Sequence, residues 1–144
     1  MKFFQDDMIL HIIYEMKDDI TPLIEIANCY EGNINGRTGF NFPIHIINNI
    51  KNNMMVNKIL SYKEIKYIIV YKKGDIMTKK HELQHAKYYL DENFRKEVAN
   101  LWDSFNNKFK KRALEMLKKM NYPDHVIMDE FQAYYFTEKP NFFA

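Results

Sequence analysis

Cysteine is almost absent from this chain, because Cys29 is the only one. A single cysteine excludes a disulfide within the chain and is typical of proteins in a reducing compartment. We expect Cys29, which has no metal-binding spacing around it, to be a small buried residue. An excess of charge is also lacking, since 21 basic and 19 acidic side chains leave a formal net charge of +2. We therefore expect no nucleic acid or other polyanion as a partner.

Long apolar runs are lacking as well. No segment approaches the length of apolar sequence that crosses a bilayer, so we expect no membrane partner. Near the start of the chain, Asp6 and Asp7 interrupt any apolar stretch, which argues against a secretory signal. We therefore expect a cytoplasmic protein. A length of 144 residues and a hydrophobic content of 47% suit a single domain, residues 1–144, with one core.

Short segments rich in β-branched and aromatic residues predict a small sheet. Residues 65–71 are the clearest strand, because a turn sequence at 72–75 stops them. Residues 8–14 predict another strand or a short buried helix, which periodicity alone does not separate. Residues 33–39 predict a turn-rich loop, and the alternating residues 40–42 predict a short strand after it.

Helical spacing of apolar residues predicts several helices, so the expected fold class is α+β. Thr21 and the proline after it are typical of a helix N-terminus, and Gly32 is typical of the end of that helix. Asp124 is the expected cap of the last helix. The further helices are predicted over residues 44–60, 78–90, 92–120 and 125–137, with residues 106–107 as the break if the third of these is two helices.

Residues 81–85 read His-Glu-Leu-Gln-His and carry the strongest functional signal. Histidines four residues apart on a helix project to the same side, so His81 and His85 can bind one metal ion. Glu82 lies next to that metal, where it can take a proton from a water molecule that the metal holds. The apolar residues that would pack on a sheet fall on the opposite side of the helix: Leu83, Ala86 and Leu90.

The HExxH pattern resembles that of the zincin metallopeptidases, which implies a zinc-binding α+β domain with an active-site helix. A catalytic zinc normally has three protein ligands, so one more ligand is needed. Residues 129–135 resemble the later helix of the gluzincins, which implies Glu130 as the third ligand and Ala133 as a small residue where two helices cross. The family often has an acid at the position of Tyr134 to hold a ligand histidine by its second nitrogen. Here Asp129 or a backbone carbonyl would have to do so.

Asp91 is the alternative third ligand. It follows His85 by six residues, which is the spacing that metzincins use. Those enzymes have a glycine three residues after the second histidine, to turn the chain back toward the metal. This chain has Tyr88 there, which favours continued helix and would carry Asp91 away. The geometry therefore favours Glu130.

The resemblance implies a metallopeptidase that uses one zinc ion and acts on a peptide or protein substrate. Glu82 would be the general base on the zinc-bound water and would then pass the proton to the leaving nitrogen. Tyr134, Tyr135 and His125 are candidate donors to the oxyanion, and the sequence does not select among them. In zincins the substrate lies extended near the active helix, and residues 65–71 are the expected sheet member near that cleft.

The sequence is also compatible with two other functions. The first is a zinc-binding protein without peptidase activity that binds a protein partner through its cleft. Glu82 argues against it, because a structural zinc gains nothing from a general base. The second is a metal-free helical interaction module in which the motif is accidental. A chelator would leave the thermal unfolding of such a module unchanged.

Other polar residues have structural explanations. His11 and His45 lie among isoleucines and are expected to be satisfied core histidines. The basic residues at 108–112 predict a solvated helix face. The tyrosine pair at 88–89 is expected to pack in the core or at its rim.

Overall fold

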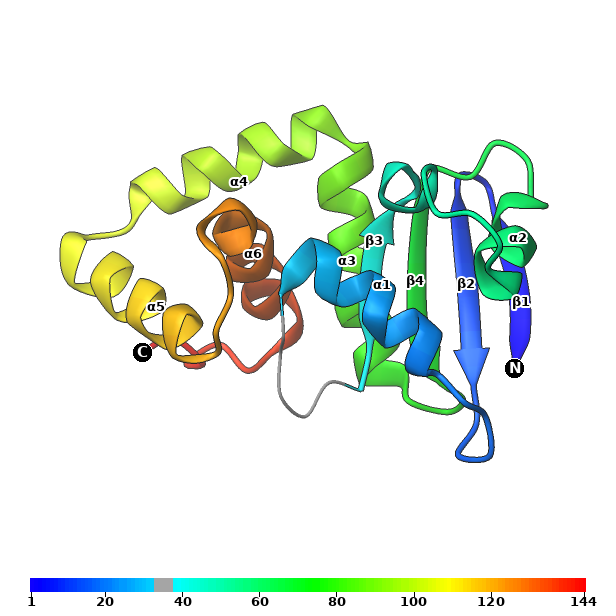
Figure 1. Ribbon diagram of the computed structural model, residues 1–144. Helices are drawn as coiled ribbons and strands as arrows, with labels where there is room; N and C mark the ends of the chain where they lie inside the picture. Colours follow the sequence, from blue (N-terminus) through cyan, green and yellow to red (C-terminus); the bar gives the residue numbers. More distant parts are fainter. Residues whose placement is uncertain (33–37) are drawn as a thin grey trace.

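The computed structural model describes residues 1–32 and 38–144, which contain a mixed four-stranded sheet with helices on both faces (Figure 1). The strands lie in the order β1-β2-β4-β3. β2 and β4 are parallel, while β1 and β3 run antiparallel to their neighbours. The predicted α+β class is therefore confirmed. The strand bounds are β1 Lys2–Asp6, β2 Ile9–Tyr14, β3 Phe40–Pro43 and β4 Tyr67–Lys72.

Side chains that alternate along β4 build an apolar core on each face of the sheet. Ile68 and Val70 pack with α1 (Thr21–Glu31) and α2 (Met54–Leu60) on one face. α3 (Ile76–Leu90) packs on the other face. This second face is where the motif helix lies. The β4 side chains that pack beneath α3 are Tyr67, Ile69 and Tyr71.

Three C-terminal helices lie on the side of α3 away from the sheet (Figure 1). They are α4 (Glu92–Ser104), α5 (Asn107–Lys119) and α6 (Ile127–Thr137). Their shared core is aromatic and centres on Phe131, which is completely buried. α6 packs directly against α3, so α3 is held between the sheet and a helical layer. Across the described ranges, no helix combines the length and the apolar character that a membrane span requires.

Several predicted elements are confirmed. The segment 65–71 forms β4, and the segment 8–14 forms a strand, β2, and no helix. Gly32 is the C-cap of α1. The segment 92–120 is two helices, because the side chain of Asn106 caps α5 by accepting a hydrogen bond from the backbone of Phe109 at 2.8 Å. Of the loop predicted at 33–39, residues 33–37 lie outside the described residues.

The single helix predicted over residues 44–60 is wrong. A short 3-10 helix at Ile44–Ile47 is followed by an irregular segment, and α2 begins only at Met54. Asn52 has a φ of +58°, which no α-helix tolerates, and Asn53 caps α2 through its side chain. The helical spacing misled because both pieces bury residues in the same core.

Three predicted helix starts also shift. Thr21 is already inside α1, and Ile20 is at the N-cap position without a side-chain cap. Asp124 begins a short 3-10 helix that precedes α6 and does not cap α6. α3 begins at Ile76, two residues earlier than predicted, because Asp75 caps it. All three differences are local and leave the helices in place.

Two residues expected in the core are exposed. Cys29 is exposed because α1 turns the side that carries Ile26 and Ala27 toward the sheet. His45 is exposed in the 3-10 helix. His11 is buried as predicted, since it is 2% exposed and its Nδ1 lies 2.9 Å from the hydroxyl of Tyr71. It is only half satisfied, because its Nε2 is buried without a hydrogen-bond partner among the described residues.

Candidate metal centre

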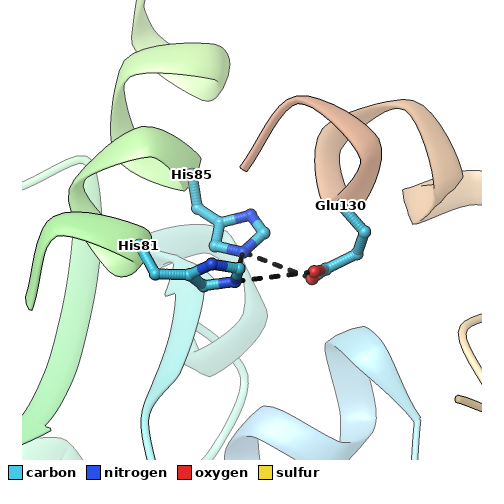
Figure 2. A group of neighbouring side chains, drawn as sticks. All are labelled: His81, His85 and Glu130. Atoms are coloured by element: carbon cyan, nitrogen blue, oxygen red, sulfur yellow. Dashed lines mark hydrogen bonds and ion pairs between the residues drawn. The ribbon is translucent and has the colours of Figure 1, made fainter. Parts of the chain in front are cut away.

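α3 presents different residues to the sheet and to α6. Ala86 is completely buried against the sheet, and Leu83 and Leu90 pack beside it, as predicted. The opposite side of the helix directs His81 and His85 toward α6 (Figure 2). The sheet therefore sets the rotation of α3, and this rotation points both imidazoles at a single neighbouring helix.

The two histidines and Glu130 meet between α3 and α6 (Figure 2). The Nε2 atoms of His81 and His85 are 3.2 Å apart. Glu130 Oε1 lies 3.3 Å from His85 Nε2, and Glu130 Oε2 lies 3.8 Å from His81 Nε2. One ligand atom from each residue lies within 4.8 Å of the others. This His–His–Glu group (His81, His85 and Glu130) could hold a metal ion.

Asp129 orients His85 through Nδ1, the ring nitrogen that is directed away from Glu130. Its Oδ1 lies 2.9 Å from His85 Nδ1, so that nitrogen carries the proton and Nε2 faces Glu130. The same Oδ1 accepts a hydrogen bond from Gln132 Nε2 at 2.9 Å. Gln132 also donates to the backbone oxygen of Gln84 at 3.1 Å. These bonds tie α6 to α3 beside the His–His–Glu group.

Thr137 orients His81 in a similar way. Its hydroxyl donates to the backbone oxygen of Ala133 at 2.6 Å, so the hydroxyl oxygen is left as an acceptor. His81 Nδ1 lies 3.3 Å from this oxygen and can donate its proton there. The Nε2 atom of His81 then has its lone pair directed toward His85 and Glu130.

Burial shifts the pKa of both histidines and of two glutamates in the centre. It raises the pKa of Glu82 and of Glu130 to about 7 and lowers that of His81 to about 4. Burial also lowers the pKa of His85, but the carboxylates of Asp129 and Glu130 raise it by more, so the net shift is upward. Carboxylates and imidazoles are thus packed together where water cannot screen them. A bound cation would relieve this strain on the ionised carboxylates.

A cavity of about 250 Å³ opens onto the group. The cavity passes between the N-terminal part of α3 and the C-terminal part of α6. Its third side is the chain just before β3, which is one of the two edge strands of the sheet. The expected strand, residues 65–71, is β4, which lies one position further in. The wall residues include Met77, Thr78, Tyr134, Thr137, Thr38 and Gly39.

The predicted oxyanion donors separate in the structure. Tyr134 lines the cavity, with its ring centroid 4.6 Å from that of His81 and its hydroxyl 2.9 Å from that of Tyr122. Tyr135 instead packs in the aromatic core of the C-terminal helices. His125 is exposed, and its Nε2 lies 3.0 Å from a backbone oxygen of α1. Only Tyr134 is therefore brought to the centre.

Asp91, the alternative third ligand, is not brought to the centre. It is exposed at the junction of α3 and α4. Its Oδ1 accepts a hydrogen bond from the backbone of Phe94 at 3.1 Å, so it caps α4. The group with ligand atoms close enough to share a cation contains Glu130 and not Asp91.

Sequence reasoning missed three residues beside Glu82. Asn41 donates from Nδ2 to Glu82 Oε2 at 2.9 Å, and to Glu31 Oε1 at 3.3 Å. Glu31, the last residue of α1, is buried and lines the cavity. Gly39 approaches so closely that an added Cβ atom would lie 2.8 Å from Glu82 Oε1. The available signal was the alternation at 40–42, which turns Asn41 away from its two phenylalanine neighbours.

No protein-family model, curated protein or solved structure matches this chain. The side chains of the centre are therefore what indicates a function. They provide two imidazole nitrogens, one carboxylate and a second carboxylate, Glu82, beside them. This set can hold a cation and can also move a proton.

Proposed function

We propose that this protein is a zinc-dependent metallopeptidase in which the His–His–Glu group holds the metal and Glu82 is the general base. The observation that carries the proposal is the approach of the ligand atoms of His81, His85 and Glu130 to within 4.8 Å of one another. Catalytic zinc commonly has three protein ligands of this kind and one position left for water.

The donor atoms of the group suit a cation. Both imidazoles direct Nε2 toward the same place, and Glu130 Oε2 is buried with no hydrogen-bond partner in the described part of the chain. Imidazole nitrogens together with one carboxylate favour zinc or another transition metal, whereas magnesium and calcium prefer oxygen ligands. The contact of Asp129 with His85 Nδ1 is the support that ligand histidines commonly receive.

When bound, zinc would polarise the carbonyl of a peptide bond and lower the pKa of a water molecule to about 7. Glu82 would take a proton from this water as its oxygen attacks the carbonyl carbon. It would then give the proton to the amide nitrogen as the carbon–nitrogen bond breaks. Burial raises the pKa of Glu82 to about 7, a value that suits both accepting and returning a proton near neutral pH.

Tyr134 is the proposed donor to the oxyanion. It is the only one of the three predicted donors that lines the cavity, and its ring lies against His81. Burial raises the pKa of its hydroxyl to about 12, so it keeps its proton and can donate a hydrogen bond. An extended peptide would lie along β3, whose preceding residues Thr38 and Gly39 form the cavity wall.

Metal analysis and peptide cleavage together test the proposal. Protein purified without added metal should contain about one equivalent of zinc, and His85→Ala should lose it. His45→Ala, which removes an exposed histidine outside the group, should keep it. A peptide library should be cleaved by the wild type, with loss of cleavage on chelation and recovery when zinc is returned.

Two results would contradict the proposal. Less than about half an equivalent of zinc in carefully purified protein would argue against the metal centre. Zinc binding without cleavage of any peptide would favour a zinc-binding protein that uses its cleft to bind a partner. A zinc-binding protein without catalytic activity would have no need of a general base such as Glu82.

A further inference from the structure

Asn41 is a buried amide within an apolar strand. Its neighbours Phe40 and Phe42 are completely buried in the core between the sheet and α1. Asn41 faces the other side of β3, opposite Ile69 of β4, and is 2% exposed. Burying an amide is costly unless its donor and acceptor are both used, so the partners of Asn41 indicate what it does.

The amide of Asn41 makes hydrogen bonds to residues of three other elements, β4, α3 and α1. Its Oδ1 accepts a hydrogen bond from the hydroxyl of Tyr67 at 2.5 Å. Its Nδ2 donates to Glu82 Oε2 at 2.9 Å and to Glu31 Oε1 at 3.3 Å. An ionised carboxylate only accepts hydrogen bonds, so the amino group of the amide faces the two glutamates when they are ionised. The carbonyl then faces Tyr67, which has to be the donor.

The other oxygen of Glu82 lies beside Gly39, where the chain has no side chain. Oε1 lies so close to Gly39 that a Cβ atom at this position would approach it to 2.8 Å. Asn41 and Gly39 are separated by one residue, so the same segment donates a hydrogen bond to one oxygen and leaves room for the other. Glu82, which is on α3, is thereby held at Oε2, while the lack of a side chain at Gly39 leaves room beside Oε1.

We propose that Asn41 is a positioning residue that holds Glu82 in the orientation for proton transfer, with Tyr67 fixing the direction of the Asn41 amide. The proposal rests on the proposed function, because it concerns the proton acceptor of that reaction. Side chains that accept protons in catalysis need orientation as well as a suitable pKa, and a hydrogen bond to one oxygen leaves the other for water. Neither Asn41 nor Tyr67 is among the residues that would hold the metal.

The first test needs neither metal nor turnover. In nitrogen-15 NMR spectra, the side-chain amide signal that disappears in Asn41→Ala belongs to Asn41. We expect its protons to exchange slowly with water and its signal to shift in Glu82→Ala and in Tyr67→Phe. Tyr71→Phe is the matched control, since it removes a tyrosine hydroxyl from the same face of β4. That hydroxyl contacts His11 and not the centre. If the chemical shift of the Asn41 amide is the same in Glu82→Ala as in the wild type, the hydrogen bond between Asn41 and Glu82 is excluded.

The second test separates positioning from metal binding. Asn41→Ala should lower kcat about 10- to 100-fold, which is the size of effect expected for a residue that supports a catalytic group. KM and zinc content should stay near wild type, because Asn41 is not expected to touch substrate or metal. Tyr67→Phe should lower kcat by less, and Tyr71→Phe should leave it unchanged.

The outcomes distinguish this proposal from the proposed function. A responsive amide signal together with an unchanged kcat in folded Asn41→Ala would overturn positioning and leave the peptidase intact. Loss of zinc in Asn41→Ala would mean that Asn41 supports the metal site. That result would also overturn the proposal that Asn41 positions Glu82. A wild type that has the hydrogen bond and binds zinc but cleaves no peptide would overturn the proposed function itself, and the catalytic role of Asn41 with it.

Discussion

Asp129 and His85, which come from α6 and α3, are joined by a contact of 2.9 Å between Oδ1 and Nδ1. Asp129 directly precedes Glu130, so one turn of α6 provides both a candidate ligand and the support for another ligand. This allows a tyrosine to stand at position 134, where the gluzincins that the motif resembles often have the supporting acid. The tyrosine is then available for the cavity wall.

The contact between Asp129 and His85 should strengthen zinc binding. Asp129→Ala should weaken zinc affinity about 10- to 100-fold, because His85 loses the group that orients its ring and increases its basicity. Competition with a chromogenic chelator would measure the change. Asp103→Asn, an exposed acid on α4, is the control and should bind zinc like the wild type. Equal affinity in Asp129→Ala would show that His85 needs no such support.

Replacing Glu82, the proposed general base, should separate metal binding from catalysis. Glu82→Gln should keep the full zinc content and lower kcat about 100-fold or more, since the amide cannot accept the proton of the water. Zinc analysis and chelator-sensitive peptide cleavage on the same preparation would measure both. Glu115→Gln changes an exposed carboxylate on α5 and should have no effect. Wild-type turnover in Glu82→Gln would remove Glu82 from the mechanism.

Gly39 leaves space for Glu82 and Thr78. In Gly39→Ala the new Cβ would lie 2.4 Å from Thr78 Cγ2 and 2.8 Å from Glu82 Oε1, so both side chains must move. We expect a loss of about 1–3 kcal/mol in unfolding free energy and a lower kcat. Adding Thr78→Ser removes the clashing methyl group and keeps the hydroxyl that contacts Asp75.

The double variant Gly39→Ala/Thr78→Ser separates the effect of Gly39 on stability from its effect on Glu82. It should recover much of the stability, as measured by denaturant unfolding, without recovering kcat, because the contact with Glu82 persists. Recovery of both quantities together would mean that Gly39 matters only for the fit with Thr78.

Stability of the metal-free protein should fall as pH rises from 6.5 to about 8. Glu82 and Glu130 have a folded-state pKa of about 7, above the ordinary 4.5, so the folded state keeps protons that the unfolded state has released. Their stabilisation is present at low pH and is lost as pH rises through 7. His81, whose pKa falls from 6.5 to about 4, acts in the opposite direction mainly between those two values, so only the end of its effect reaches this window.

Thermal unfolding in chelator at the two pH values would test this sign. Glu130→Gln should reduce the pH dependence, because one of the buried carboxyl groups is removed. With saturating zinc the trend should reverse, since protons compete with the metal for the same ligands. A metal-free melting temperature that is constant or rises over this window would contradict the assigned pKa directions.

Tyr134 should matter for turnover, whereas its neighbour should not. Tyr134→Phe removes the hydroxyl at the cavity wall and should lower kcat about 100-fold, the usual cost of one oxyanion donor. Tyr135→Phe removes a hydroxyl from the aromatic core and should change kcat little. Zinc content should be normal in both variants. Similar kcat values for the two variants would exclude Tyr134 as the donor.

Local sequence patterns were sufficient for the motif helix and for most of the sheet. The spacing of His81 and His85 requires only that the segment is helical, and Leu83, Ala86 and Leu90 correctly indicate which side meets the sheet. The same kind of pattern failed at residues 44–60, because apolar spacing does not register a residue such as Asn52 with positive φ. It also failed for Cys29, since residue type is a weak guide to burial on a half-buried helix.

What the sequence by itself determined is therefore the helix that carries both histidines and the glutamate between them. It also led to Glu130 through a resemblance, but it contains no distance between Glu130 and the histidines. Only the packing of α6 on α3 decided that Glu130 and Asp129 reach the imidazoles, while Asp91 caps a helix instead. Only the pairing of β3 with β4 placed Asn41 and Tyr67 beside Glu82. These contacts depend on long-range packing, because no local sequence pattern indicates which residues far apart in the chain lie close together in the fold.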